Sequence, residues 1–278
     1  MKNVIVVFSM FCMTISVYAA KVDTLLVRSH VMNKTIKNVV ITPDLYTANK
    51  QAYPVVYLLH GAGGNHKAWL GKSPQIKDYA DEYNVIIVCP DGDKTSWYFD
   101  SPIDDTMKYE TYIAKELVLK IDQTYHTRSD AKFRAITGYS MGGHGALYLA
   151  FKHQDVWGAT ASMSGGVDLR PFPLRWDIAK RLGTYAENKT VWEDHSVINM
   201  THLLDGKQLK ILFDCGVDDF FYDANVRLHK KLVQRNIPHD YIERPGGHTN
   251  AYWANSIQYQ MLFFSNYFKN SKNNVHEN

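Results

Sequence analysis

Cysteine is scarce in this sequence, and its scarcity excludes a fold built on disulfide bonds. Three cysteines occur among 278 residues, too few for the dense disulfide frameworks of small secreted domains. Cys12 lies in the first apolar run, whereas Cys89 and Cys215 each end an apolar, strand-like segment. One disulfide between the last two is the alternative, but their apolar flanks favour two buried thiols.

An excess of charge of one sign is missing too, as is any low-complexity block. The 31 Lys and Arg residues nearly balance 28 Asp and Glu, which leaves a net charge of +3. With no basic stripe or acidic tail, nucleic acid is not a predicted partner. A chain of this length that is 45% hydrophobic can bury one large core. We therefore expect a single domain over residues 20–270, followed by a polar tail at 271–278.

One long apolar run stands at the very start of the chain. It follows the basic Lys2, covers residues 4–17 and leads to small residues at Ala19 and Ala20. The run is too short to span a bilayer comfortably, and the pattern is typical of a secretory signal peptide over residues 1–19. An uncleaved anchor is the alternative. The sequence thus predicts a secreted or periplasmic protein that leaves the membrane after cleavage.

Strand-like and helix-like segments alternate along the rest of the chain. Residues 21–43 form two alternating apolar runs, which predict an antiparallel pair at a sheet edge. Further strands are predicted at 53–60, 84–90, 133–139, 158–164, 208–215 and 239–243, and helices at 76–83, 109–125, 146–151, 224–234 and about 250–268. This order predicts an α/β fold, a mostly parallel sheet with helices on both faces. In such sheets the active site lies at the carboxyl ends of the strands.

Residues 166–200 interrupt this alternation. The segment is rich in aromatic residues, including Phe172, Trp176, Tyr185 and Trp192. Two interpretations stay open: a lid or substrate-binding insertion, and an ordinary packed helical excursion.

A serine stands between glycines where a predicted strand meets a predicted helix. The sequence there is Gly-Tyr-Ser-Met-Gly-Gly, residues 138–143. A tight turn at this junction lifts a serine hydroxyl above the sheet, and the glycines let neighbouring backbone pass closely. The segment therefore predicts a nucleophile elbow with Ser140 as the nucleophile.

A nucleophilic serine needs a histidine base and an acid that orients the base. In hydrolases with this elbow the chain order is serine, acid, histidine. Of the histidines that follow a suitable acid, His248 alone lies in a loop directly after the last predicted strand. Asp218 and Asp219 share the turn after the preceding strand, and either can serve as the acid. Asp214 lies within that strand and is expected to be structural.

Glycines also follow the third predicted strand, in the segment Leu-Leu-His-Gly-Ala-Gly-Gly at residues 58–64. Such a loop supplies one backbone donor to an oxyanion hole, and the residue after the nucleophile supplies the other. We expect the amides of Ala62 and Met141 in these roles. His60 and His66 are not expected to be metal ligands, because no third ligand stands at a zinc-like spacing, and structural roles are favoured over metal binding. No metal and no cofactor is predicted.

Four segments together resemble one known family. They are Tyr-Leu-Leu-His-Gly at 57–61 with Trp69 downstream, Pro-Asp-Gly-Asp at 90–93, the elbow, and Cys-Gly-Val-Asp-Asp-Phe at 215–220. The chain resembles the esterase D or carbohydrate esterase family 1 group of α/β-hydrolases, which includes feruloyl and acetylxylan esterases, S-formylglutathione hydrolases and mycolyltransferases. The resemblance implies an α/β-hydrolase fold and favours Asp219 over Asp218. Asn250 and Tyr252 depart from it, since tryptophans are often seen there.

The resemblance also implies an activity, the hydrolysis of a carboxylic ester through a serine acyl-enzyme without a cofactor. Ser140 would attack, His248 would relay the proton and Asp219 would fix the tautomer of the histidine. The expected substrates are small-molecule or polysaccharide esters, above all acyl or feruloyl esters of carbohydrate. The candidate substrate-binding residues are His60, Trp69, Trp97, Tyr98 and Trp253. The aromatic residues among them can equally belong to the core, and at any single position core packing is the favoured interpretation.

Other functions remain as alternatives. They are a general short-chain esterase, an enzyme that resembles S-formylglutathione hydrolase, which the predicted signal peptide disfavours, and acyl transfer to a hydroxyl. An alternative of a different class is a hydrolase-fold protein that binds without turnover.

Overall fold

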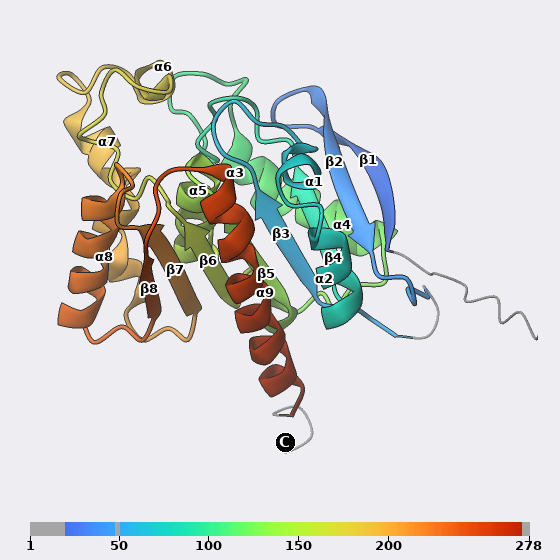
Figure 1. The fold of residues 1–278 in the computed structure, drawn as a ribbon. Coiled ribbons are helices and arrows are strands. Elements are labelled where there is room, and N and C mark those ends of the chain that lie inside the picture. Colours follow the sequence, from blue (N-terminus) through green and yellow to red (C-terminus); the bar gives the residue numbers. More distant parts are fainter. Residues whose placement is uncertain (1–19, 48–50, 274–278) are drawn as a thin grey trace, which may run out of the picture.

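The computed structural model describes residues 20–47 and 51–273 (Figure 1). The predicted signal peptide at residues 1–19 lies outside the described residues, as does most of the predicted polar tail. Within the described part, no helix combines the length and the apolarity needed to cross a membrane.

Eight strands of the described chain form one sheet at the centre of the molecule. Their order across the sheet is β1-β2-β4-β3-β5-β6-β7-β8. β1 pairs antiparallel with β2, and β2 with β4, whereas all the later neighbours pair in parallel. This confirms the predicted sheet and its antiparallel edge. The strands are β1 (Lys21–Ser29), β2 (Lys34–Thr42), β3 (Val55–Leu59), β4 (Ile86–Pro90), β5 (Arg134–Gly138), β6 (Ala159–Met163), β7 (Lys210–Gly216) and β8 (Asp240–Arg244).

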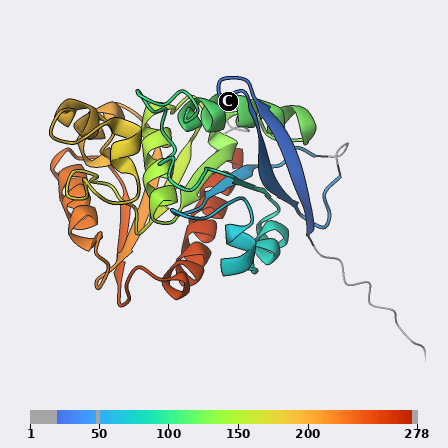
Figure 2. The same ribbon diagram turned by 90° about the horizontal axis from the view of Figure 1, so that it is seen from above.

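Helices cover both faces of this sheet, as Figure 2 shows with α9 (red) and α2 (cyan) on one side and α4 (green) on the other. α1, α2 and α9 pack on one face, and α4, α5 and α8 on the opposite face. Each central strand alternates its apolar side chains between the two cores, which is why β3 to β6 are buried throughout. The helices are α1 (Ala68–Lys72), α2 (Ile76–Tyr83), α3 (Tyr109–Thr111), α4 (Val118–Thr124), α5 (Met141–Lys152), α6 (Ile178–Leu182), α7 (Lys189–Asp194), α8 (Tyr222–Gln234) and α9 (Asn250–Asn273).

The helix predicted at 109–125 is present but is not regular. α3 runs into a π-helical segment, Tyr112–Leu117, which continues into α4. The wider turn lies where the Tyr112 hydroxyl donates a hydrogen bond to Oδ1 of Asn38 in β2. This contact ties the helix layer to the antiparallel edge of the sheet.

The segment 166–200 is partly buried in the core and partly lines a cavity. It runs between β6 and β7, and Ile178, Leu182 and Trp192 are fully buried in the core. Trp176 and Asp177 instead line a cavity above the strand ends. Most of the segment is therefore packed structure, and its middle lines the cavity.

The two cysteines of the described chain have the burial that their flanking residues predicted. Cys89 and Cys215 are free and buried, and burial raises the pKa of each thiol far above its ordinary value. The expectation of two buried thiols is thus confirmed for the described chain.

Candidate active site

Ser140 occupies the turn between β5 and α5 with a backbone conformation that L-amino acids rarely adopt. Its φ is 57° and its ψ is −118°, a strained geometry that is typical of functional sites. The turn packs directly on β3. A Cβ added to Gly142 would lie 2.4 Å from the Leu59 carbonyl oxygen, and one added to Gly138 would lie 2.6 Å from the same atom. The glycines are therefore required for the backbones to pass, as the elbow motif predicted.

The three residues predicted to act together form one hydrogen-bonded chain. The Ser140 hydroxyl donates to Nε2 of His248 at 2.8 Å. Nδ1 of His248 in turn donates to Oδ2 of Asp219 at 2.8 Å. The carboxylate accepts the Nδ1 proton, so the Nε2 lone pair faces the serine. The arrangement has the geometry of a nucleophile, a base and an acid that orients the base.

Asp219, and not its neighbour, faces the imidazole. Its side chain is fully buried, and its second oxygen, Oδ1, accepts a hydrogen bond from the Phe221 amide at 2.8 Å. Asp218 is exposed, and its amide donates to the Gly246 carbonyl at 3.0 Å. The turn thus divides the two carboxylates between the interior and solvent.

The loops that carry Asp219 and His248 are joined beneath the site. Asp214 in β7 is 1% exposed, and Oδ1 accepts from Arg244, the last residue of β8, at 3.0 Å. The same carboxylate accepts from two side chains of α9, Ser256 at 2.6 Å and Gln260 at 2.7 Å. Asp214 is therefore the structural carboxylate that its place in the strand suggested, and it links β7 to the end of β8 and to α9.

Two backbone amides stay available beside the serine. Among the described residues, the amides of Ala62 and Met141 donate no hydrogen bond to the protein. Ala62 lines the cavity next to Ser140, and Met141 begins α5, where the helix leaves its first amides unpaired. Their place and their free donors fit an oxyanion hole.

His60 is placed in the protein interior and not on the cavity wall. It is 1% exposed, and burial lowers the pKa of its imidazole. Its Nδ1 donates to the Gly61 carbonyl at 2.8 Å, and its Nε2 accepts from the Gly92 amide at 2.9 Å. A neutral imidazole thus links the loop after β3 to the loop after β4. His66 lies 3.2 Å from Asp91, a structural contact as well.

Of the four predicted aromatic pocket residues, the structure brings only Trp253 to the cavity. Trp69, Trp97 and Tyr98 are at most 1% exposed. Tyr98 enters the core because two glycines leave room for its ring. A Cβ at Gly92 would lie 2.2 Å from that ring, and one at Gly145 would lie 2.5 Å from it. These three aromatic residues are therefore part of the core and do not line the cavity.

The cavity at Ser140 and His248 has a volume of about 1020 Å³. Residues that sequence reasoning missed also line it, notably Lys72 at the end of α1, Lys94 in the loop after β4, and Phe220. The sequence could have indicated Phe220 as a cavity residue, because it directly follows Asp219. Lys72 lies three residues after Trp69, but nothing in the sequence indicated its contact with Asn250, which is 178 positions away. The other lining residues include Gly61, Ala62, Gly63, Gly64, Thr95, Tyr139, Trp176, Asp177, Thr249, Asn250 and Trp253.

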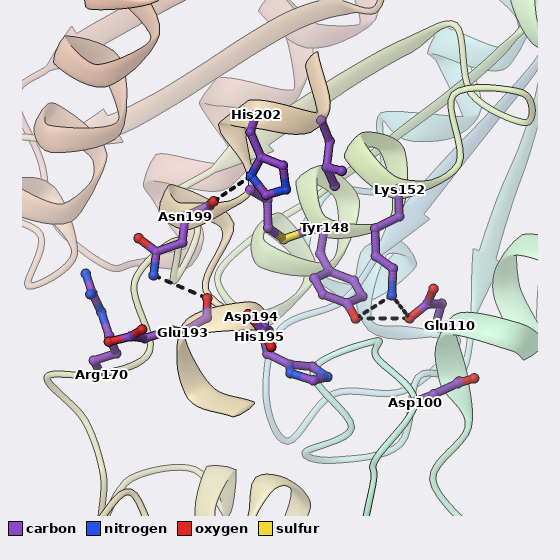
Figure 3. A pocket seen from close by; sticks show the side chains of 12 residues that line it. Asp100, Glu110, Tyr148, Lys152, Arg170, Glu193, Asp194, His195, Asn199 and His202 are labelled. Carbon is purple, nitrogen blue, oxygen red and sulfur yellow. Dashed lines mark hydrogen bonds and ion pairs between the residues drawn. The ribbon is translucent and has the colours of Figure 1, made fainter. Parts of the chain in front are cut away.

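A second cavity of about 690 Å³ lies between α3, α5 and α7. Figure 3 shows Tyr148 and Lys152 converging on Glu110, which accepts hydrogen bonds from them at 3.0 and 2.7 Å. His153 donates to the other carboxylate oxygen at 2.8 Å. The residues that line this cavity include no serine, so the cavity at Ser140 is the candidate active site.

We predict that the Glu110 cluster makes stability depend on acid pH. Burial alone would raise the pKa of Glu110, but hydrogen bonds from His153 and Lys152 outweigh it and lower the pKa from 4.5 to about 2. A carboxyl with a lowered pKa stabilises the fold above its unfolded-state value, and the contribution is lost as pH falls through the folded-state value. Wild type should exceed Glu110→Gln by about 3 kcal/mol in unfolding free energy at pH 7.

Urea denaturation of both proteins between pH 7 and pH 2 measures this difference. The gap between them should narrow as pH falls from about 4.5 toward 2. A gap that stays constant over this range would show that the shape of the side chain matters and its charge does not.

Solved structures share this architecture over nearly their whole length. A ferulic acid esterase is 28% identical, with a TM-score of 0.77, and the match covers 90% of this chain and 99% of that one. The S-formylglutathione hydrolase FrmB of Staphylococcus aureus is 22% identical, with a TM-score of 0.77 and coverage of 88% and 99%. The second match shows the fold alone. The two together confirm the predicted α/β-hydrolase fold.

Sequence relatives agree with the structural likeness. Esterase Rv1288 of Mycobacterium tuberculosis (strain ATCC 25618 / H37Rv) is 34% identical in an alignment of 235 residues, and the match covers 75% of this chain and 51% of that protein. The chain thus spans about half the length of the curated relatives it matches. Residues 29–264 match the family model described as "Putative esterase". The resemblance first drawn from four short segments is confirmed, and the chain belongs to this esterase family.

Proposed function

We propose that this protein is a serine carboxylic-ester hydrolase that acts through an acyl-enzyme. One observation carries the proposal: the strained Ser140 donates to His248, and His248 donates to the buried Asp219, with both distances at 2.8 Å. Two unpaired amides and a large cavity lie beside the serine. Family membership supports the same reaction class.

In the first half of the proposed reaction, His248 removes the proton of the Ser140 hydroxyl as the oxygen attacks the ester carbonyl. The amides of Ala62 and Met141 stabilise the negative charge that develops on the carbonyl oxygen. Asp219 keeps the proton on Nδ1 and stabilises the imidazolium as it forms. His248 then protonates the leaving alcohol, and the acyl group stays on Ser140.

In the second half, water takes the place of the alcohol. His248 removes a proton from the water, the resulting hydroxide attacks the acyl-enzyme, and the acid leaves as Ser140 regains its proton. A sugar hydroxyl in place of water would give acyl transfer by the same steps. The cavity has room for either acceptor. Because water is the more abundant of the two, we propose hydrolysis as the default reaction.

Esters of carbohydrate, with small acyl or feruloyl groups, are the substrates we propose. The aromatic wall supports them, since Phe220 is 52% exposed and stacks on Trp176 with ring centroids 5.6 Å apart. Exposed aromatic faces bind sugar rings and phenolic groups. The ferulic acid esterase whose fold matches adds support. The apolar start of the chain supports export, so we place the enzyme outside the cytoplasm.

A substrate panel tests the proposal. We expect the mature protein to release acid from p-nitrophenyl acetate, methyl ferulate and acetylated xylan, and rapid mixing followed by intact-mass measurement should detect an acyl adduct on Ser140. Strong preference for p-nitrophenyl butyrate, with no action on ferulate or xylan esters, would favour a general short-chain esterase. Preference for S-formylglutathione would favour the thioesterase alternative.

A further inference from the structure

The wall of the catalytic cavity carries positive charge that the protein does not neutralise. Lys72 and Lys94 both line the cavity. In the part of the chain that the structure describes, neither lysine forms an ion pair with a carboxylate. The carboxylate of the same wall, Asp177, is already paired with Lys180 at 2.9 Å and accepts a hydrogen bond from Thr95. The cavity therefore presents more positive than negative charge to a ligand.

Lys72 is held near the reacting groups. Its Nζ donates to Oδ1 of Asn250 at 2.5 Å, and it lies 5.6 Å from the ring of Tyr139 and 5.7 Å from the ring of Trp253. Tyr139 directly precedes Ser140, and the ring of Trp253 is 4.9 Å from that of His248. The Lys72 side chain is half-buried, so its position is fixed by contacts on several sides.

Lys94 is tied to the oxyanion loop through its backbone. Its carbonyl accepts a hydrogen bond from the Gly63 amide at 2.8 Å, next to Ala62. The Lys94 side chain is exposed and free to reach a bound ligand. Two lysines thus come from different parts of the chain, one beside the base and one beside the proposed oxyanion hole.

Resting on the proposed ester hydrolysis, we propose that this cavity selects esters that carry an anionic group, such as a carboxylate, phosphate or sulfate, through Lys72 and Lys94. An anion bound there would pair with the two ammonium groups, which form no ion pair within the described protein. Each partly exposed charge pair contributes modestly, and two of them support a preference of roughly tenfold. The aromatic part of the wall leaves room for an apolar or sugar portion of the same ester.

Matched pairs of esters test this selection. The acyl arm compares p-nitrophenyl hemisuccinate with p-nitrophenyl methyl succinate, and the alcohol arm compares meta-acetoxybenzoate with its methyl ester. For wild type we expect kcat/KM to favour the anionic member about tenfold in one arm, which also assigns the anion to the acyl or the alcohol side. The ratio should fall toward one in the Lys72→Gln/Lys94→Gln double variant and at high salt.

Lys77→Gln is the matched control, because Lys77 is an exposed lysine of α2 that is absent from the cavity wall; its ratio should equal that of wild type. A wild-type ratio near one in both arms would overturn the inference while leaving the hydrolase proposal intact. A preference that survives in the double variant would overturn it too. If no ester turns over, the hydrolase proposal fails, and tryptophan fluorescence of the Ser140→Ala protein titrated with each pair still decides the inference. Equal affinities for the two members of both pairs would overturn it.

Discussion

Ser140→Ala lowers kcat for p-nitrophenyl butyrate by about a millionfold and leaves a remnant of about a thousandfold over water. The expected loss is this large because the serine, the histidine and the acid act as one unit, and without the nucleophile no acyl-enzyme forms. The remnant reflects substrate binding and the amides of Ala62 and Met141, which the substitution leaves in place. Steady-state kinetics at high enzyme concentration measures both quantities.

Ser129→Ala is the matched control, because Ser129 is exposed and its side chain lies away from the candidate site; full activity is expected. Far-UV circular dichroism of both variants should match wild type. If Ser140→Ala kept most of the rate, a different nucleophile would be acting. If wild type itself showed no turnover on any ester and Ser140→Ala kept the full biological effect, the binding-protein alternative would hold.

We expect Asp219→Asn to lower kcat by about ten-thousandfold, with little change in KM. Oδ2 of Asp219 now accepts the Nδ1 proton of His248 at 2.8 Å, whereas an asparagine amide can present an N–H there and favour the wrong tautomer. With the proton moved to Nε2, the imidazole cannot accept the proton of the Ser140 hydroxyl. Loss of the carboxylate charge also removes the stabilisation of the imidazolium.

Asp218→Asn provides a control at the adjacent position, with the same chemical change on an exposed side chain. We expect its kcat to stay within about twofold of wild type, as for other exposed substitutions. Comparable losses in the two variants would mean that the charge of the turn matters and the contact with His248 does not. A larger loss in Asp218→Asn would reassign the acid.

The chain order of motifs made most of the candidate site predictable. Ser140 follows from the glycines around it, and His248 follows from its place after the last strand. The residues alone did not identify Asp219 as the acid. Asp218 lies in the same turn, and the sequence allows either aspartate to reach the imidazole. The family resemblance favoured Asp219, and in the structure the packing of that turn, with Oδ1 on the Phe221 amide, separates the two.

The substrate pocket was the least predictable part. Tyr98 and Trp97 lie in the segment that follows β4, where a side chain can enter the core or the cavity. Their left-handed backbone, with φ of 61° and 57°, turns them inward, and Gly92 and Gly145 leave space for the Tyr98 ring. Part of that space depends on Gly145, a residue far from Tyr98 in sequence. The same holds for Lys72, which meets Asn250 across 178 positions of the chain.

The distance along the chain between the reacting groups has a consequence for synthesis. Ser140 and His248 are 108 residues apart, and Asp219 also follows the serine. A ribosome that has completed β5 and α5 has therefore made the strained serine without its base or its acid. On the proposed mechanism the growing chain is inert, and hydrolysis begins only when the C-terminal third has emerged and folded.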